Sequence, residues 1–107
     1  MVRDATPLEH NSMDGLDRLI HEPARLSLMS CLYVIREADF VFLQNETGLS
    51  AGNISSHMSK LEAAGYVEVH KVFVGRRPQT RLRMTETGRE ALAAYLRTMG
   101  EFVGQLR

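Results

Sequence analysis

Three patterns in this 107-residue sequence predict its fold class. Two helical stretches between residues 40 and 64 are separated by a short turn that contains Gly48. A β-hairpin pattern tipped by Gly75-Arg76-Arg77-Pro78 follows, and a longer helical stretch with one apolar stripe comes last. This order predicts an α+β fold, mostly α, of the winged helix-turn-helix type, with a two-stranded β-wing and a C-terminal dimerisation helix.

The chain length fits a single domain, and a hydrophobic content of 44% is ordinary for a globular protein. We expect residues 1–12, which lack periodicity, to form a flexible tail. Residues 13–107 then form the domain, and residues 84–107 its terminal helix. The single cysteine, Cys31, excludes an intrachain disulfide and cysteine-based metal sites within one subunit. No apolar run is long enough for a membrane span, so the sequence predicts a cytoplasmic protein without a membrane partner.

Charge is balanced overall but unevenly distributed along the chain. The 13 basic and 13 acidic side chains cancel, so the whole protein has no net field that would attract nucleic acid. Residues 1–22 hold five acidic and two basic side chains, whereas residues 66–83 hold five basic side chains and one acidic one. This separation favours one docking orientation on a polyanion.

The first half of the sequence predicts four helices. Leu16, Leu19 and Ile20 have helical spacing in a segment that begins at Ser12 or Asp14 and is broken or restarted by Pro23. Residues 24–35 are apolar on nearly every side, which predicts a central helix surrounded by other elements. Asp39 caps a helix over residues 40–47 that ends at Gly48, and Ser50 caps a second one that reaches Ala64 and stops at Gly65.

The second half predicts the wing and the terminal helix. Residues 66–74 are rich in β-branched and aromatic side chains, and residues 80–84 alternate basic and apolar ones, so the two segments read as a hairpin. Thr85 is the expected cap of the last helix.

The helix at residues 50–64 is the predicted recognition helix. Ile54, Met58 and Leu61 share one face, while small polar side chains occupy the other. Such side chains are short enough to enter a major groove and form hydrogen bonds with base edges. The expected double-stranded DNA contacts on the helix are Ser50, Gly52, Asn53, Ser55, Ser56, Ser59 and Lys60. The alternative is an ordinary solvated helix face.

Residues 71–81 are the predicted wing, placed on the minor groove or the phosphate backbone. Its expected DNA contacts are Lys71, Arg76, Arg77, Thr80 and Arg81. The alternative is a solvated turn. Because so few charges would give one subunit only modest affinity, we expect a homodimer on a pseudo-palindromic site.

The terminal helix offers a dimer contact. Apolar residues recur on it at alternating steps of four and three, as in a coiled-coil seam. The expected interface residues are Leu92, Tyr95, Leu96, Met99, Phe102, Val103 and Leu106. The competing interpretation is that the same stripe packs on its own domain.

The remaining polar residues predict no further chemistry. Cys31 lies in the most apolar segment and reads as a small buried hydrophobe, with a redox-sensing thiol as the alternative. His57 reads as a boundary residue of its helix, and the other histidines have no metal-ligand spacing. We find no phosphate loop, nucleophile elbow or acid–base pair, so we expect no enzymatic activity, no metal and no cofactor.

The segment LSAGNISSHMSKLEAAGYVEVHKVFVGRRPQTRLRMTETGREAL closely resembles winged-helix regulators related to the MarR and ArsR groups, and the resemblance spans about residues 15–97. It implies a dimeric bacterial or archaeal transcription factor. Asn53, Ser56 and Lys60 match the DNA-facing positions of the helix, and Arg76, Arg77 and Arg81 match those of the wing. Residues 85–107 lack the Cys and His ligands of the metal-responsive relatives, and the chain is shorter than MarR-type regulators.

The function we expect is therefore that of a sequence-specific DNA-binding regulator, in the form of a homodimeric repressor. The alternative from another class is a winged-helix adaptor that binds proteins without reading DNA. A small-molecule effector or a redox signal at Cys31 is compatible with the first hypothesis.

Overall fold

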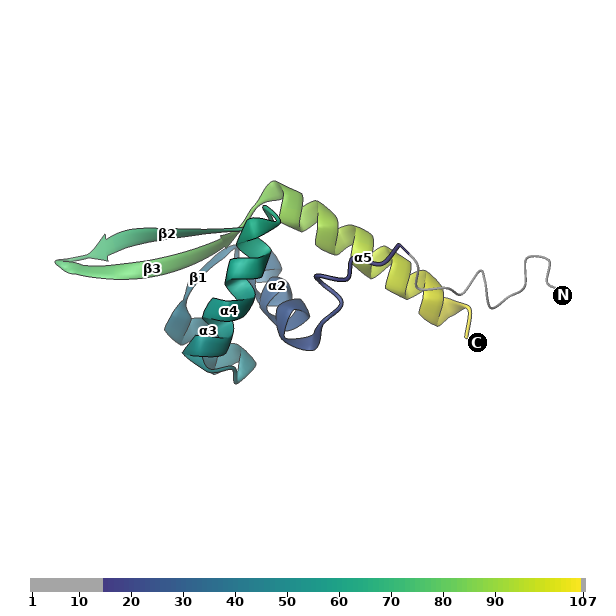
Figure 1. Ribbon diagram of the computed structural model, residues 1–107, viewed down its shortest axis with the longest axis horizontal. Helices are drawn as coiled ribbons and strands as arrows, with labels where there is room; N and C mark the ends of the chain where they lie inside the picture. Colours follow the sequence, from purple (N-terminus) through teal and green to yellow (C-terminus); the bar gives the residue numbers. More distant parts are fainter. Residues whose placement is uncertain (1–14, 107) are drawn as a thin grey trace, which may run out of the picture.

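The computed structural model describes residues 15–106. Helices α2, α3 and α4 form a central body from which the β2–β3 hairpin and helix α5 project in opposite directions (Figure 1). The elements in chain order are α2 (Pro23–Ile35), β1 (Glu37–Asp39), α3 (Phe40–Thr47), α4 (Ala51–Ala63), β2 (Val67–Val74), β3 (Arg77–Met84) and α5 (Glu86–Gly104). The predicted tail, residues 1–12, and the proposed helix starts Ser12 and Asp14 lie outside the described residues.

Local capping chemistry sets the helix ends as predicted. The Asp39 carboxylate accepts the Phe42 N–H at 2.8 Å and begins α3, which ends at Gly48 in the left-handed conformation, φ 76°. Ser50 begins α4, because its hydroxyl accepts the Asn53 N–H at 3.1 Å. The same chemistry at Thr85 begins α5. Each cap satisfies an N–H group that the helix itself leaves without a partner.

One core joins all the elements. Helix α2 supplies Leu28, Met29 and Leu32, α4 supplies Ile54, Met58 and Leu61, the sheet supplies Ala38, Val67, Leu82 and Met84, and α5 supplies Leu92 and Tyr95. The predicted inner face of α4 is thus confirmed. Because that face is held by the core, the opposite face of α4 is left toward solvent.

Two expectations about the first helices are wrong. Residues 18–20 form a turn rather than a helix, because the Asp17 carboxylate accepts the N–H groups of Leu19 (2.9 Å) and Ile20 (3.2 Å) and holds the backbone locally. Helix α2 is also not surrounded on all sides, since the Val34 side chain is 78% exposed. Its apolar outer residues lie near the C-terminal end of the helix.

The sheet has three antiparallel strands in the order β1-β3-β2, and the sequence did not predict β1. Its residues Glu37, Ala38 and Asp39 pair with Arg83, Leu82 and Arg81. Arg36, with φ 72°, turns the chain from α2 into this strand. Three polar or small residues carry no strand signal of their own, so only the partner strand defines β1.

The hairpin turn is tighter than expected. Strand β3 begins at Arg77 rather than at Thr80, and Val74 pairs with Arg77, so only Gly75 and Arg76 form the loop. Gly75 has φ 65°, which suits the first central position of a two-residue hairpin turn. Pro78 is tolerated in the strand because β1 pairs only with residues 81–83, so no neighbour requires its missing N–H.

A close joint links α4, the wing and α5. The Thr85 hydroxyl donates to the Gly65 carbonyl at 2.6 Å and accepts the Gly88 N–H at 3.0 Å, and the Thr85 N–H donates to the Tyr66 carbonyl at 3.0 Å. Gly88 is buried there, and a Cβ atom at this position would lie 2.1 Å from the Tyr66 carbonyl oxygen. The joint therefore requires a residue without a side chain.

We expect Gly88→Ala to lower the free energy of unfolding by about 1–3 kcal/mol, because the added methyl group must displace backbone atoms. The matched control is Gly100→Ala on the same helix, where a Cβ atom meets no atom of residues 15–106 within 4 Å. That substitution should leave stability unchanged or raise it by up to about 1 kcal/mol through helix propensity. Urea unfolding followed by circular dichroism measures both variants, and equal stabilities would refute the steric argument.

Tyr66 ties the N-terminal segment to this joint. Its hydroxyl donates a hydrogen bond to the Asp17 carboxylate, and that bond, with burial and the Asp17 charge, raises the pKa of Tyr66 to about 12. The folded-state pKa lies above the ordinary value of 10.0, so the folded protein favours the protonated phenol. The resulting stability is fully present below about pH 10 and is lost as the pH rises toward about 12.

Tyr66→Phe removes this hydrogen bond and should lower the free energy of unfolding by about 1–2 kcal/mol at neutral pH. The difference from the parent should shrink between about pH 10 and about pH 12, where the parent loses the protonated phenol. Urea titrations across that range measure it. The control is Tyr33→Phe, since within residues 15–106 the Tyr33 hydroxyl makes no hydrogen bond. A pH-independent difference for Tyr66→Phe would contradict the linkage.

Candidate nucleic-acid interface

The outer face of α4 is built as the sequence predicted. The predicted contact residues on the helix are all exposed: Ser50, Gly52, Asn53, Ser55, Ser56, Ser59 and Lys60. Apart from Lys60, none of these side chains is longer than Asn, so the helix presents a polar surface from which few atoms project far. A surface of this kind can approach base edges closely.

The N-terminus of α4 is open to a partner. Among the described residues, a Cβ atom at Gly52 would meet only the Ser50 hydroxyl, at 4.0 Å, so none of these neighbours requires glycine there. The Ser50 hydroxyl already accepts the Asn53 N–H, whereas the first N–H groups of a helix have no intrahelical partner. This end of the helix can therefore receive a phosphate.

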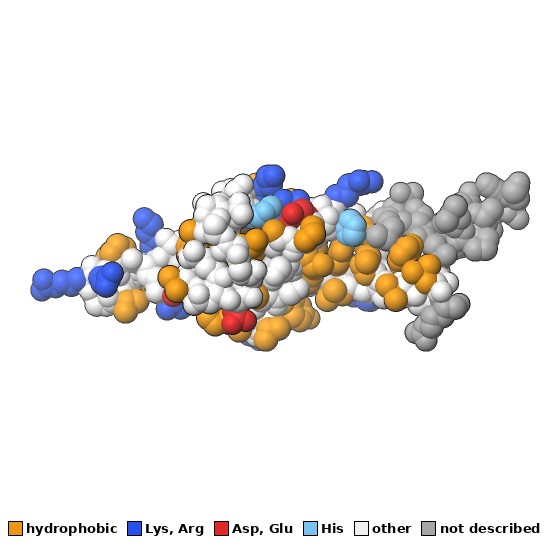
Figure 2. Space-filling view, turned by 90° about the horizontal axis from the view of Figure 1, so that it is seen from below, with side chains coloured by type: hydrophobic (Ala, Val, Ile, Leu, Met, Phe, Trp, Pro, Cys, Tyr) orange, Lys and Arg blue, Asp and Glu red, His pale blue; other side chains and the backbone are white. Residues whose placement is uncertain are grey.

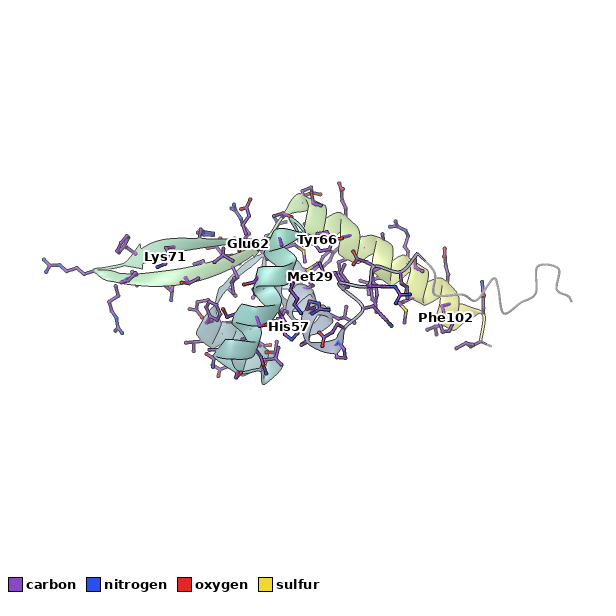
Figure 3. All side chains as sticks on the ribbon, viewed as in Figure 1. Met29, His57, Glu62, Tyr66, Lys71 and Phe102 are labelled. Atoms are coloured by element: carbon purple, nitrogen blue, oxygen red, sulfur yellow. The ribbon has the colours of Figure 1, made fainter. Side chains whose placement is uncertain are left out.

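His57 is confirmed as a boundary residue. It is half-buried, and its Nδ1 atom lies 3.1 Å from the Arg25 guanidinium, which is always a donor. Arg25 also donates from Nε to the Leu19 carbonyl at 2.5 Å. The pair holds α4 against the N-terminal end of α2, and Figure 3 shows His57 on α4. We therefore leave His57 out of the contact surface.

The register of the hairpin separates the predicted wing contacts onto two faces. Lys71 pairs with Thr80, and both lie on the face that carries Val67 and Met84 into the core. Arg81 pairs with His70 and lies on the opposite face. The structure thus brings Lys71 and Thr80 together and places Arg81 away from them.

Arg81 belongs to a polar network with β1. Its guanidinium donates from Nε to the Gln79 side-chain oxygen at 2.8 Å and from Nη1 to Glu37 at 3.3 Å. The Gln79 amide donates to the second Asp39 oxygen at 2.9 Å, while the first Asp39 oxygen caps α3. His70 lies 3.8 Å from the same Glu37 carboxylate. The network fastens the wing to the start of α3, and sequence reasoning missed it because β1 was missed.

A second ion pair neutralises the base of the hairpin. The Arg83 guanidinium lies 2.5 Å from the Glu68 carboxylate, which lowers the pKa of Glu68 and raises that of Arg83. Within residues 15–106, Lys71, Arg76 and Arg77 are exposed and form no ion pair. The positive charge of the wing is therefore concentrated toward its tip, where Figure 2 shows basic side chains at the narrow end of the molecule.

The predicted dimer residues fall into two groups. Leu92 and Tyr95 are buried in their own domain, and the Tyr95 hydroxyl lies 2.7 Å from His21 Nδ1. Met99 and Phe102 are half-buried, and Leu96, Val103 and Leu106 are exposed. Figure 3 places Phe102 near the free end of α5, at the opposite end of the molecule from Lys71.

Other sites carry little chemistry. Burial, with a smaller contribution from Glu46, raises the pKa of the Cys31 thiol, which disfavours the reactive thiolate. No group of three or more metal-ligating side chains occurs within residues 15–106. In the same part of the chain, no helix has the length and apolar character that crossing a membrane requires.

An open cleft of about 270 Å³ lies between the N-terminal segment and α5, lined by Gly15, Asp17, Tyr66, Ala91, Ala94, Tyr95 and Thr98.

Several known proteins are similar to this chain in sequence or in fold. The uncharacterised protein MJ0432 of Methanocaldococcus jannaschii is 29% identical over 79 residues, which cover 74% of this chain and 86% of the relative. The structure of a transcriptional regulator homologue protein from Pyrococcus horikoshii OT3 superimposes with a TM-score of 0.81 at 30% identity, over 94% of this chain and 96% of that one.

A MarR-family transcriptional regulator from Silicibacter pomeroyi superimposes with a TM-score of 0.66 at 17% identity, over 83% of this chain and 59% of that one. This likeness concerns the fold, and it confirms the expected winged helix-turn-helix architecture. The sequence profile described as winged helix DNA-binding domain matches residues 24–103. With α4, the β2–β3 hairpin and all but the last residue of α5 inside that match, the chain belongs to the winged helix DNA-binding domain family.

Proposed function

We propose that the protein is a homodimeric, sequence-specific regulator of transcription that binds double-stranded DNA. The observation that carries the proposal is the pairing of a small polar face on α4 with unneutralised cations toward the wing tip, in a chain whose total charge is zero. The name of the Pyrococcus horikoshii relative, a transcriptional regulator homologue, supports it. Repression follows if the bound dimer excludes other proteins from the same duplex.

We assign the recognition helix, residues 50–64, to the major groove and the wing, residues 71–81, to the minor groove and backbone. Asn53 is the residue suited to hydrogen-bond a base edge, and Ser55, Ser56 and Ser59 can bond bases or phosphates. Lys60, Lys71, Arg76 and Arg77 neutralise phosphates, with Thr80 beside Lys71. Arg81 is proposed as a positioning residue, because its Nε and Nη1 atoms already donate to Gln79 and Glu37.

The dimer contact is proposed on the outer half of α5. Leu96 and Val103 are seven residues apart, as are Met99 and Leu106, so they continue the stripe that Leu92 begins in the core. The exposed fractions of Leu96, Val103 and Leu106 are 50%, 54% and 66%. Apolar side chains spaced in this way along a helix fit a second copy of the same helix.

Two further functions are compatible with the geometry. The exposed side chains Val34, Val41 and Phe42 near the junction of α2 and α3 favour the alternative of a protein-binding adaptor without DNA readout. A small-molecule effector would fit the cleft beside α5, and its binding would then act on a DNA-binding dimer. Neither function replaces the proposed one unless duplex binding is absent.

Selection of bound duplexes from a random library should recover a two-fold symmetric sequence, because a dimer presents α4 twice. Asn53→Ala should relax the preference at one position of each half-site, with a discrimination loss of about 1–3 kcal/mol. Lys60→Ala is the control and should weaken all sequences alike. Recovery of no duplex would sink the proposal in favour of the adaptor, and an unchanged motif would remove Asn53 from the readout.

Replacing both Arg76 and Arg77 with alanine should weaken DNA binding and flatten its salt dependence. Removing one phosphate contact reduces the slope of log K against log salt by about 0.9. The control replaces the internal pair instead, with Glu37→Gln and Arg81→Gln together, and should leave the slope nearly unchanged. Fluorescence anisotropy at several salt concentrations measures both slopes. If the control flattens the slope as much as the arginine variant does, the division between contact and positioning residues is wrong.

A further inference from the structure

The tip of the wing carries apolar side chains that the proposed phosphate contacts do not use. Phe73 is 73% exposed and Val74 is 56% exposed. Both lie on a projecting strand, where polar side chains would interact better with water. Exposed aromatic side chains at a projecting tip indicate a contact with a partner. The partner must also accommodate the cations around them.

The register places Phe73 beside Pro78. The two residues are directly paired across the hairpin, next to the Val74–Arg77 pair that flanks the turn. In a hairpin with a two-residue loop, the pair that flanks the turn is hydrogen-bonded, so Phe73 and Pro78 form the following pair, whose side chains lie closer together. They form one apolar ridge on the wing.

The ridge faces the same side as two of the predicted wing contacts, Lys71 and Thr80. Phe73 alternates with Lys71 and Val67 along β2, so it lies on the sheet face that carries Lys71 and Thr80. Val74 lies on the opposite face with Arg77. Figure 2 shows hydrophobic and basic side chains interleaved at this end of the molecule.

We propose that Phe73 and Pro78 form a wedge that enters the DNA minor groove and partly unstacks one base step. The inference rests on the proposed function and adds a contact whose strength depends on how easily the DNA sequence deforms. Lys71 lies on the same face as the ridge, Arg76 lies in the adjoining turn and Arg77 lies on the opposite face, so cations flank the ridge and match the phosphates on the rims of that groove. Apolar wedges of Phe or Pro kink a duplex at flexible steps, and pyrimidine–purine steps unstack most readily.

The wedge would therefore select sequence without hydrogen bonds to bases. Sites with a TA or CA step under the wing should bind more tightly than sites with a stiff A-tract there. Removing one aromatic–base contact weakens binding by roughly tenfold. The wedge is distinct from the arginine contacts, because its removal leaves the number of phosphate contacts unchanged.

The test uses the full chain and the duplex that the library selection recovers. 2-Aminopurine replaces, in turn, each adenine in the flanks of the site, and its fluorescence reports unstacking at saturating protein. The parent protein should raise the fluorescence at one flanking step. Phe73→Ala should abolish that rise and weaken binding by roughly tenfold. Phe73→Leu should retain most of the rise, because Leu is also a wedge residue.

Val74→Ala is the matched control, since it removes a neighbouring exposed apolar side chain from the opposite face of the hairpin. It should bind and unstack like the parent. Equal behaviour of the Phe73→Ala and Val74→Ala variants, or tight binding by the parent without any rise, would overturn the wedge and leave the proposed function standing. A change of oligomeric state in Phe73→Ala without DNA would assign the ridge to a contact between copies. Absence of any duplex binding would overturn both proposals.

Discussion

The close approach of Gly88 to the Tyr66 backbone is the constraint on which the rest of the structure depends. The chain passes from α4 into the wing on one side of this contact and from the wing into α5 on the other, and Thr85 bonds both sides together. A side chain at Gly88 would separate them, since its Cβ atom would lie 2.1 Å from the Tyr66 carbonyl oxygen. The direction of the wing relative to α4 therefore depends on the absence of one methyl group.

Ion pairing then decides where the positive charge of the wing is available. Glu37 and Glu68 neutralise Arg81 and Arg83 near the base of the hairpin, and the described residues offer no acidic partner to Arg76 and Arg77 at the tip. The same pairs stiffen the base, because Arg81 is linked through Gln79 to the residue that caps α3. A rigid base and a free cationic tip suit the proposed contact of the wing with DNA at a fixed distance from α4.

Much of the fold could be predicted because local chemistry sets it. The parts that depend on pairing between distant segments could not be predicted from the sequence. Asp39, Gly48, Ser50 and Thr85 set helix ends through bonds within a few residues, so the sequence alone located them. The exposed face of α4 followed from helical periodicity. Strand β1 could not be predicted, since its residues become a strand only when β3 lies beside them, and the role of Arg81 depended on that pairing. The turn at residues 18–20 was missed because the Asp17 side chain outweighs the helical spacing of Leu16, Leu19 and Ile20.

The stripe along α5 shows why one sequence pattern can serve two contacts. Its spacing is uniform from Leu92 to Leu106, so the sequence could not divide it between the domain core and a partner. Burial makes that division: Leu92 and Tyr95 are enclosed by the domain, and Leu96, Val103 and Leu106 are exposed. A domain that buries only the first part of the stripe can keep its own core while the second part associates. Dimerisation would then add stability that rises with the logarithm of protein concentration, without requiring α5 to leave its domain, because the two contacts use different side chains of one helix.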